Sequence, residues 1–293
     1  MIEIVVALAL SAAVGVAWAF AVRVMPHADP AGSASRRVAA GLSDSPRARG
    51  FLRGRFDPQA TTGLALTIAM IAVVVAGVLF GILVTMIRQD RGVVNFDVSI
   101  TRWAATHETS ASLTFFSWVT WAGSTIGVVL VSVATIVYAL RRWRRWSVVL
   151  FFLLVVGGQF VLSNVIKVAV ERVRPDEPPF HVLPGPSFPS GHSTAAAATW
   201  AAVALVLSRG ASVPRRALLA GGAAAIAVLV GCSRVFLGAH WTSDVIGGLV
   251  LGWTWFAVCA VAFGGSVLRL GQPAEEAEEA DRAAQGPTSR AVA

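Results

Sequence analysis

The chain has few charged residues for its length of 293, and it has very little cysteine. Asp, Glu, Lys and Arg together make up 14% of the sequence, whereas a soluble domain usually carries about 25%. Hydrophobic residues make up 56%. The scarcity of charge excludes an ordinary water-soluble domain, and the composition as a whole indicates an integral membrane protein.

Cysteine is limited to Cys232 and Cys259, and both lie inside apolar segments. An isolated thiol in such a segment usually packs as a small hydrophobic residue, so the pair indicates neither a disulfide nor redox chemistry on sulfur. The polar motifs of the chain contain no group of side chains with the spacing of metal ligands. We therefore expect chemistry that needs no metal and no other cofactor.

The first apolar run lacks the positive charge that precedes the hydrophobic part of a signal peptide, because the chain begins with Met-Ile-Glu-Ile. Ala17-Trp18-Ala19 does imitate a cleavage site. The run nevertheless extends over 2–22, which is long enough to cross a bilayer. We therefore expect the segment 1–25 to hold a retained transmembrane span.

Long apolar runs are what the sequence has in abundance. A helix needs about 20 apolar residues to cross the hydrocarbon core of a bilayer. We predict an all-α polytopic membrane bundle, with a six-span core over 61–265 and one additional N-terminal span. Gly248 and Gly252 are spaced for close packing against another helix of this bundle. The predicted spans are 2–22, 61–87, 112–140, 147–170, the short alanine-rich run 192–208, 217–237 and 241–265.

The net charge of +8 comes from arginines that lie in alternate loops between the predicted spans. Basic residues are retained on the cytoplasmic side of a membrane, so this distribution predicts a topology and requires no nucleic acid. The cytoplasmic segments are then the arginine-rich linker 26–60, the loop 141–146, the loop after residue 208 and the acidic tail 266–293. The extracytoplasmic loops are 88–111, 171–191 and 233–240.

Three of these segments have a composition of their own. The linker 26–60 mixes Pro, Gly, Ser and Arg without apolar periodicity, which predicts a flexible segment. The tail 266–293 is acidic and is predicted to be disordered. In 88–111, apolar residues alternate with Asp97, Arg102 and Glu108, a pattern typical of an amphipathic segment at the outer interface or of a loop.

The only lysine, Lys167, lies at the end of an apolar run, and Arg174 follows seven residues later. This separation places both cations on one helical face, and Pro175 is expected to end the helix. Two such cations could hold a doubly charged phosphate, the lysine as a point charge and the arginine as a bidentate fork. Basic residues at the end of a span also commonly reach for lipid head groups.

The sequence Pro189-Ser190-Gly191-His192 lies where a predicted span begins. Ser190 is a good N-cap, and the free N–H groups at the start of a helix form an anion site. Gly191 would allow a ligand to approach the backbone. His192 would then lie beside a bound phosphate, where it could protonate a leaving oxygen. A plain helix cap with a surface histidine is the alternative.

His240 and Asp244 follow Arg234 at the end of another predicted span. Their spacing of four places them on one face of a helix, so the carboxylate could hold one ring nitrogen and direct the other outward as a nucleophile. Arg234 could bind the same phosphate across a turn at Gly238. A buried hydrogen bond without catalysis is the alternative, and the spacing alone leaves open which histidine attacks.

Together these motifs resemble the signature of the type-2 phosphatidic acid phosphatase superfamily. These lipid phosphate phosphatases are related to the vanadium haloperoxidases. The resemblance covers about residues 61–265 and implies an all-helical core of six spans with an extracytoplasmic, metal-independent active site. The matching positions are Lys167-(six)-Arg174-Pro175, Pro189-Ser190-Gly191-His192 and Ser233-Arg234-(five)-His240-(three)-Asp244.

The resemblance also implies a role for the residues of the motifs. His240 would attack the phosphorus and form a phosphohistidine, and Asp244 would orient it. His192 would protonate the leaving oxygen and then activate water. The phosphoryl oxygens would be bound by Lys167, Arg174, Ser190, Gly191 and Arg234.

We therefore expect a cell-membrane enzyme that hydrolyses a lipid phosphate monoester or pyrophosphate at the extracytoplasmic face. The leading substrates are an isoprenoid pyrophosphate and a phosphatidate-like glycerolipid; we favour the pyrophosphate, although no residue selects it. The expected partners are this lipid and the bilayer. Two alternatives remain open. One is a phosphotransferase that passes the phosphoryl group to an acceptor other than water. The other is a non-catalytic protein that binds or carries lipid phosphates, which the intact His192, His240 and Asp244 disfavour.

Overall fold

The computed structural model describes residues 1–24, 61–89, 92–144, 146–175 and 184–268. The predicted linker 26–60 and nearly all of the predicted tail 266–293 lie outside the described residues. Every regular element in the described ranges is helical. The elements are α1 (Ile2–Val24), α4 (Thr61–Arg88), α5 (Val93–Thr106), α6 (Ser110–Val119), η2 (Thr120–Gly123), α7 (Thr125–Trp143), α8 (Ser147–Phe152), η3 (Leu153–Gly157), α9 (Gly158–Val170), α10 (Gly191–Leu207), α11 (Val213–Phe236) and α12 (Thr242–Leu268).

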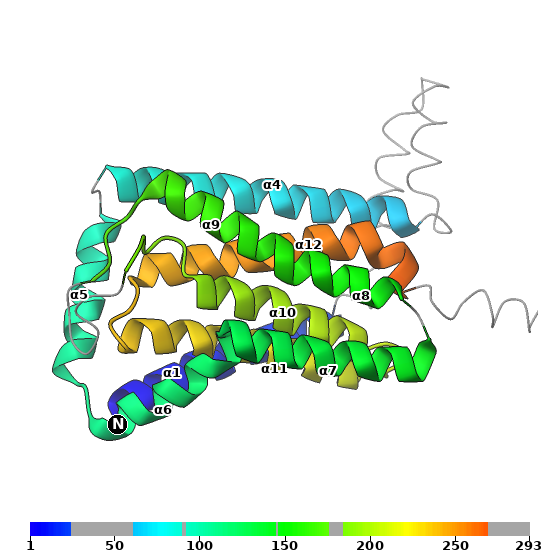
Figure 1. Ribbon diagram of the computed structural model, residues 1–293, viewed down its shortest axis with the longest axis horizontal. Helices are drawn as coiled ribbons and strands as arrows, with labels where there is room; N and C mark the ends of the chain where they lie inside the picture. The colour runs from blue at the N-terminus through cyan, green and yellow to red at the C-terminus, as the bar shows by residue number, and fades with distance from the viewer. Residues whose placement is uncertain (25–60, 90–91, 145, 176–183, 269–293) are drawn as a thin grey trace, which may run out of the picture.

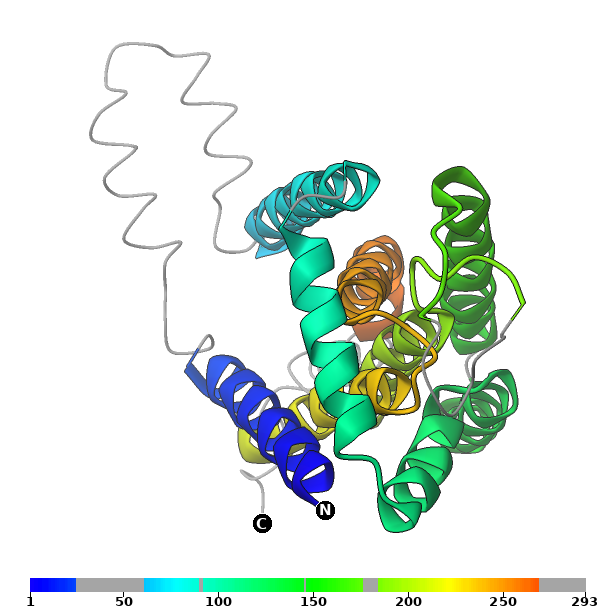
Figure 2. The same ribbon diagram turned by 90° about the vertical axis from the view of Figure 1, so that its left-hand side faces the viewer.

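The long helices run side by side along one axis of the molecule, and α5 lies across one end of them (Figure 1). Seen from that end, α10 and α12 occupy the middle of the bundle, with α4, α9, α7 and α11 around them (Figure 2). The helix α1 packs against α11 on the periphery. The arrangement places the ends of α9 and α11 and the beginnings of α10 and α12 together beneath α5.

Each predicted span corresponds to a helix or to a series of helices. Among the described residues, five helical segments are long and apolar enough to cross a bilayer, and six if the bent pair α4 and α5 counts as one span. The helix α10 has only 17 residues. It is buried along most of its length, which accounts for its alanine-rich sequence, since small side chains let neighbouring helices approach. An all-α polytopic membrane bundle is thus confirmed.

The predicted span 112–140 is interrupted. After α6, the short 3₁₀ helix η2 ends at Gly123, and Ser124 then begins α7 as its N-cap, accepting a hydrogen bond from Gly127 N at 3.0 Å. A Cβ on Gly123 would lie 2.8 Å from the carbonyl oxygen of His192. The break therefore lets the chain pass close to the first turn of α10.

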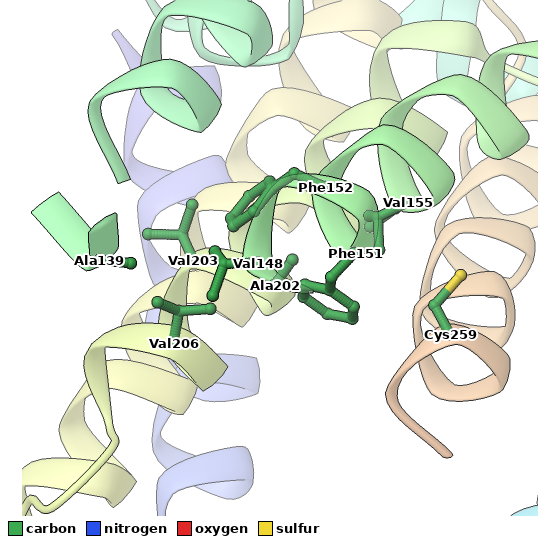
Figure 3. Close-up of a cluster of buried hydrophobic side chains, with 10 residues drawn as sticks. Ala139, Val148, Phe151, Phe152, Val155, Ala202, Val203, Val206 and Cys259 are labelled. Carbon is green, nitrogen blue, oxygen red and sulfur yellow. The ribbon is translucent and has the colours of Figure 1, made fainter. Parts of the chain in front are cut away.

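A cluster of buried hydrophobic side chains fills the part of the bundle away from α5 (Figure 3). Phe151, Phe152 and Val155, from α8 and η3, pack there against the side chains of α10. Cys259 of α12 belongs to the same cluster and is a free thiol, as its apolar surroundings in the sequence predicted. This core fixes the position of α10, and with it the position of the polar N-terminus of that helix.

The two glycines of α12 lie against α10. A Cβ on Gly248 would lie 2.6 Å from the carbonyl oxygen of Ser190, and a Cβ on Gly252 would lie 2.7 Å from the Cβ of Ala197. The predicted close packing within the bundle is confirmed. Because the backbones approach so closely, the first turns of α10 and α12 are held side by side.

Candidate active site

The eight residues predicted to form a site come together beneath α5. They come from the last turns of α9 and α11, the first turns of α10 and α12, and the loops between these helices. The backbone links two of these helix ends directly, because Ser190 N donates a hydrogen bond to the carbonyl oxygen of Asp244 at 3.0 Å. The eight residues are Lys167, Arg174, Ser190, Gly191, His192, Arg234, His240 and Asp244.

Ser190 is the N-cap of α10, as predicted. It has extended backbone angles, and its hydroxyl oxygen accepts hydrogen bonds from Ser193 N at 3.4 Å and from Ser193 Oγ at 2.9 Å. The hydroxyl hydrogen of Ser190 therefore remains free to be donated. Gly191 begins the helix, and the Nζ atom of Lys167 lies 3.7 Å from the place a Cβ on Gly191 would occupy. An ammonium group thus lies beside the first residue of the helix, whose first N–H groups have no partner within the helix.

His240 is held by Asp244, although not in the way that the spacing predicted. The helix α12 begins at Thr242, so His240 lies in the preceding turn, where Gly238 has a φ of 64°. The distance from His240 Nδ1 to Asp244 Oδ2 is 3.4 Å, and the same oxygen accepts a hydrogen bond from Trp241 N at 3.0 Å. The other ring nitrogen, Nε2, lies 3.3 Å from Arg174 Nη1. Since a guanidinium only donates, Nε2 is the acceptor and Nδ1 carries the hydrogen.

Burial decides the protonation of His240. The residue is 3% exposed, and its burial lowers the pKa of the imidazole from 6.5 to about 4, although the hydrogen bond and the negative charge of Asp244 oppose this shift. Arg234 and Arg174 lower the pKa further. The ring is therefore neutral near pH 7, so Nε2 carries a lone pair, which accepts from Arg174 here and could attack phosphorus once that guanidinium donates to a bound phosphate.

Three cations gather near the unprotonated nitrogen: Arg174 contacts it, Arg234 acts on the same imidazole, and Lys167 lies close to both arginines. Arg174 is fixed by its donation to three carbonyl oxygens, those of Gly185 at 3.0 Å, Ala239 at 2.8 Å and Pro186 at 3.3 Å. Burial lowers the pKa of Arg174 somewhat, and Asp244 opposes this effect. The group remains charged, because an arginine starts from a very high pKa.

Arg234 donates from Nη1 to Thr120 Oγ1 at 2.9 Å, while its buried Nε has no acceptor among the described residues. A buried donor without an acceptor is costly. An anion bound at this point would satisfy it. The charges of Arg234, Lys167 and Arg174 also act on the imidazole of His192, so both histidines face the same positively charged region.

A cavity of about 440 Å³ extends from this region along α9 towards the middle of the bundle. The end of the cavity at the first turn of α10 is lined by Lys167, Gly191 and His192. Gln159, Ser163 and Asn164 line the side formed by α9, and mostly small or apolar residues of η2, α7, η3 and α10 form the rest. Phe160, which is 59% exposed, also lines it, so the cavity opens sideways through the surface of the bundle.

Two charged residues at the site received no role from the sequence. Arg172 was only one of several loop cations, and Asp97 belonged to the segment predicted to be amphipathic or a loop. In the structure Asp97 lies on α5, and Arg172 forms ion pairs with Asp97 at 2.7 Å and with Asp244 at 2.6 Å. The only signal in the sequence was a carboxylate in an otherwise interfacial segment. Among the described residues, no group of three or more His, Cys, Asp or Glu side chains could hold a metal ion.

The chain matches known proteins in sequence. The model of the PAP2 superfamily matches residues 147–267. The chain is 43% identical to phosphatidylglycerophosphatase B of Bacillus subtilis over 107 residues, which are 35% of this chain and 52% of that protein. It is 40% identical to a lipid A 1-phosphatase of Rhizobium johnstonii over 119 residues, 37% of this chain and 44% of that protein. The matched region spans about half the length of these curated relatives.

The fold also has a solved counterpart. The structure of a transmembrane PAP2-type phosphatidylglycerolphosphate phosphatase of Bacillus subtilis superposes with a TM-score of 0.62 at 31% identity, covering 66% of this chain and 96% of that chain. The helices and the cluster at their ends define a polytopic membrane protein with histidines and cations gathered at one end of its bundle. The chain belongs to the PAP2 superfamily, and the predicted family is confirmed.

Proposed function

We propose that this protein is a lipid phosphatase of the cell membrane that transfers the phosphoryl group of its substrate first to His240 and then to water. The observation that carries this proposal is the geometry of His240. Its Nδ1 faces Asp244, while its Nε2 faces a region that contains three cations. A neutral, oriented imidazole in such a place is suited to attack a phosphorus atom.

The first step forms the phosphohistidine. The lone pair of His240 Nε2 attacks the phosphorus, and the bond from phosphorus to the leaving oxygen breaks. His192 donates a proton to that oxygen, and the ring of His240 becomes a cation that Asp244 stabilises. In the second step a water molecule gives a proton to His192 and attacks the phosphorus, and inorganic phosphate leaves the regenerated imidazole.

The cations bind the phosphoryl oxygens throughout. Arg174 is already held by three carbonyl groups, so little of its conformational freedom remains to be lost when phosphate binds. Arg234 offers its unpaired Nε, and Lys167 lies over the start of α10. The Gly191 N–H and the Ser190 hydroxyl add neutral donors. These groups would stabilise the charge on the equatorial oxygens in the transition state without a metal.

The cavity beside the phosphate site favours a lipid with polar atoms next to its phosphate. Gln159, Ser163 and Asn164 offer hydrogen-bonding groups close to Lys167, and the Ser163 hydroxyl has no partner among the described residues. A substrate with oxygen atoms next to its phosphate would satisfy them. Ester oxygens of a glycerolipid phosphate and the second phosphate of an isoprenoid pyrophosphate would both do so, so the cavity suits either class of lipid.

The activity can be tested with purified protein in detergent and a panel of lipid phosphates and pyrophosphates, with and without EDTA. We expect release of inorganic phosphate from at least one of these two classes of lipid, and we expect this release to survive EDTA. Complete loss in EDTA that a divalent ion restores would contradict the metal-independent mechanism. Transfer to another acceptor would indicate a phosphotransferase, and binding without turnover would indicate a carrier.

We propose that the site faces the extracytoplasmic side. The α7–α8 and α10–α11 connections carry arginines and lie at the end of the bundle opposite α5 (Figure 1). Cysteines in place of Glu108, in the connection after α5, and Trp146, at the opposite end of the bundle, should react differently with an impermeant thiol reagent on intact cells. We expect labelling of Glu108→Cys on intact cells and of Trp146→Cys only after permeabilisation. The reverse pattern would refute this orientation, and unmodified protein gives the background from Cys232 and Cys259.

A further inference from the structure

Arg172 joins two buried carboxylates at the edge of the site. It follows α9 and donates from Nη2 to Asp97 Oδ2 at 2.7 Å and from Nη1 to Asp244 Oδ1 at 2.6 Å. The side chain of Arg172 is 9% exposed, and both carboxylates are fully buried. Breaking such a pair leaves a buried charge uncompensated, so this connection between α5 and α12 is a fixed part of the structure.

Asp97 also caps α12 from outside that helix. Its Oδ1 accepts a hydrogen bond from Ser243 N at 2.8 Å, and its Oδ2 accepts one from the hydroxyl of Ser243. The first N–H groups of a helix have no partner within it, and a negative charge at this end is favourable. The helix that carries Asp244 is thus held at its first turn by a residue 146 positions away in the sequence.

The ion pair with Arg172 fixes the orientation of the Asp244 carboxylate relative to His240. Oδ1 accepts from Arg172, and Oδ2 accepts from Trp241 N and faces His240 Nδ1. With both oxygens engaged, the carboxylate cannot rotate away from the imidazole. The ring of His240 is held in turn, and its Nε2 stays directed at the phosphate site.

Asp97, Arg172 and Asp244 together carry a charge opposite in sign to the charge that His240 gains in the reaction. One guanidinium between two carboxylates leaves one net negative charge, and the ring of His240 gains one positive charge when it is phosphorylated. Without Asp97, the guanidinium would neutralise Asp244 alone, and less negative charge would remain to stabilise the ring. With Asp97 present, Asp244 keeps its effect on the imidazole while its geometry is fixed.

We propose that Asp97 and Arg172 are positioning residues of the active site, which act on His240 through Asp244. The interfacial helix α5 is thereby part of the catalytic apparatus. This inference rests on the proposed function, because it concerns the step that forms the phosphohistidine.

The test is a double-mutant cycle with Asp97→Asn and Asp244→Asn, two substitutions that keep shape but remove charge. In the otherwise unmodified enzyme, Asp97→Asn should lower kcat about tenfold and change KM by less than about twofold, because phosphate binding is untouched. In the Asp244→Asn background, the further effect of Asp97→Asn should be less than about twofold, because the path through Asp244 is already broken.

Glu108→Gln, which removes a nearby carboxylate outside the network, is the matched control and should leave kcat unchanged. An equal loss from Asp97→Asn in both backgrounds, or no loss in either, would overturn the proposal. If Asp97→Asn does not fold, Arg172→Lys gives the same test, since a lysine cannot hold both carboxylates with one planar fork. An unmodified enzyme without phosphatase activity would overturn the proposed function, and this role with it.

Discussion

Replacing His240 with alanine should abolish both turnover and the covalent phosphoenzyme. No other imidazole in the described structure is held by a carboxylate with its second nitrogen facing the three cations. Loss of the nucleophile lowers the rate by many orders of magnitude, about 10⁴-fold or more in enzymes with a covalent intermediate. Acid-quenched trapping with substrate labelled in the phosphoryl group measures the intermediate directly.

His192→Ala provides the contrast in the same experiment. If His192 only transfers protons, its loss should slow the first step more for an alkoxide leaving group than for a phosphate, which is less basic. Phosphoenzyme that does form should then hydrolyse slowly, because the attacking water has lost its base. His107→Ala, an exposed histidine at the end of α5, is the control and should leave both steps unchanged. A phosphoenzyme that persists in His240→Ala and vanishes in His192→Ala would reverse the two roles.

A methyl group added at Gly248 should have the second large effect. The Cβ of Gly248→Ala would lie 2.6 Å from the carbonyl oxygen of Ser190 and 3.0 Å from Ser193 Cβ. Neither atom can yield without moving the first turn of α10, so we expect a loss of about 2 kcal/mol or more in stability. Activity should fall as well, because the shift separates His192 from the pair formed by His240 and Asp244.

The matched control is Gly222→Ala in α11, where an added Cβ would meet nothing within 4 Å. Alanine in an open helical position should stabilise the protein by roughly 0.5–1 kcal/mol. Thermal unfolding in detergent measures the change in stability, and phosphate release measures the change in activity. Equal behaviour of the two variants would show that the approach of α10 to α12 is not needed.

The sequence predicted those parts of the site that depend on local rules. Ser190 is a strong N-cap, and it does begin α10. Gly248 and Gly252 have the spacing of a close helix contact, and they make one. Lys167 lies in the last turn of α9, at the end of its apolar run, but the helix ends at Val170 and not at Pro175. Arg174 therefore lies in the following loop, and the prediction that it shares a helical face with Lys167 was wrong. Helix capping depends on residues a few positions apart, and the length of an apolar run depends on one continuous segment. Both can therefore be recognised in a single sequence.

The parts that were missed depend on contacts between distant segments. His240 pairs with Asp244 from a turn and not from a helix. The carboxylate of Asp244 accepts from Trp241 N, and α12 starts only after Trp241. The break before α7 is needed where Gly123 meets α10. Arg172 and Asp97 are 75 positions apart. Nothing in the local pattern of either residue indicates its partner.

The sideways opening of the cavity along α9 has a consequence for kinetics. A lipid that enters between α7 and α9 arrives by diffusion in the plane of the membrane and need not leave the bilayer. The concentration that governs its capture is then the mole fraction of substrate among the surrounding lipids. Extra detergent or inert lipid at a constant bulk concentration of substrate should dilute the substrate within the surface and slow the enzyme. An apparent KM in moles per litre therefore has no fixed meaning for this protein.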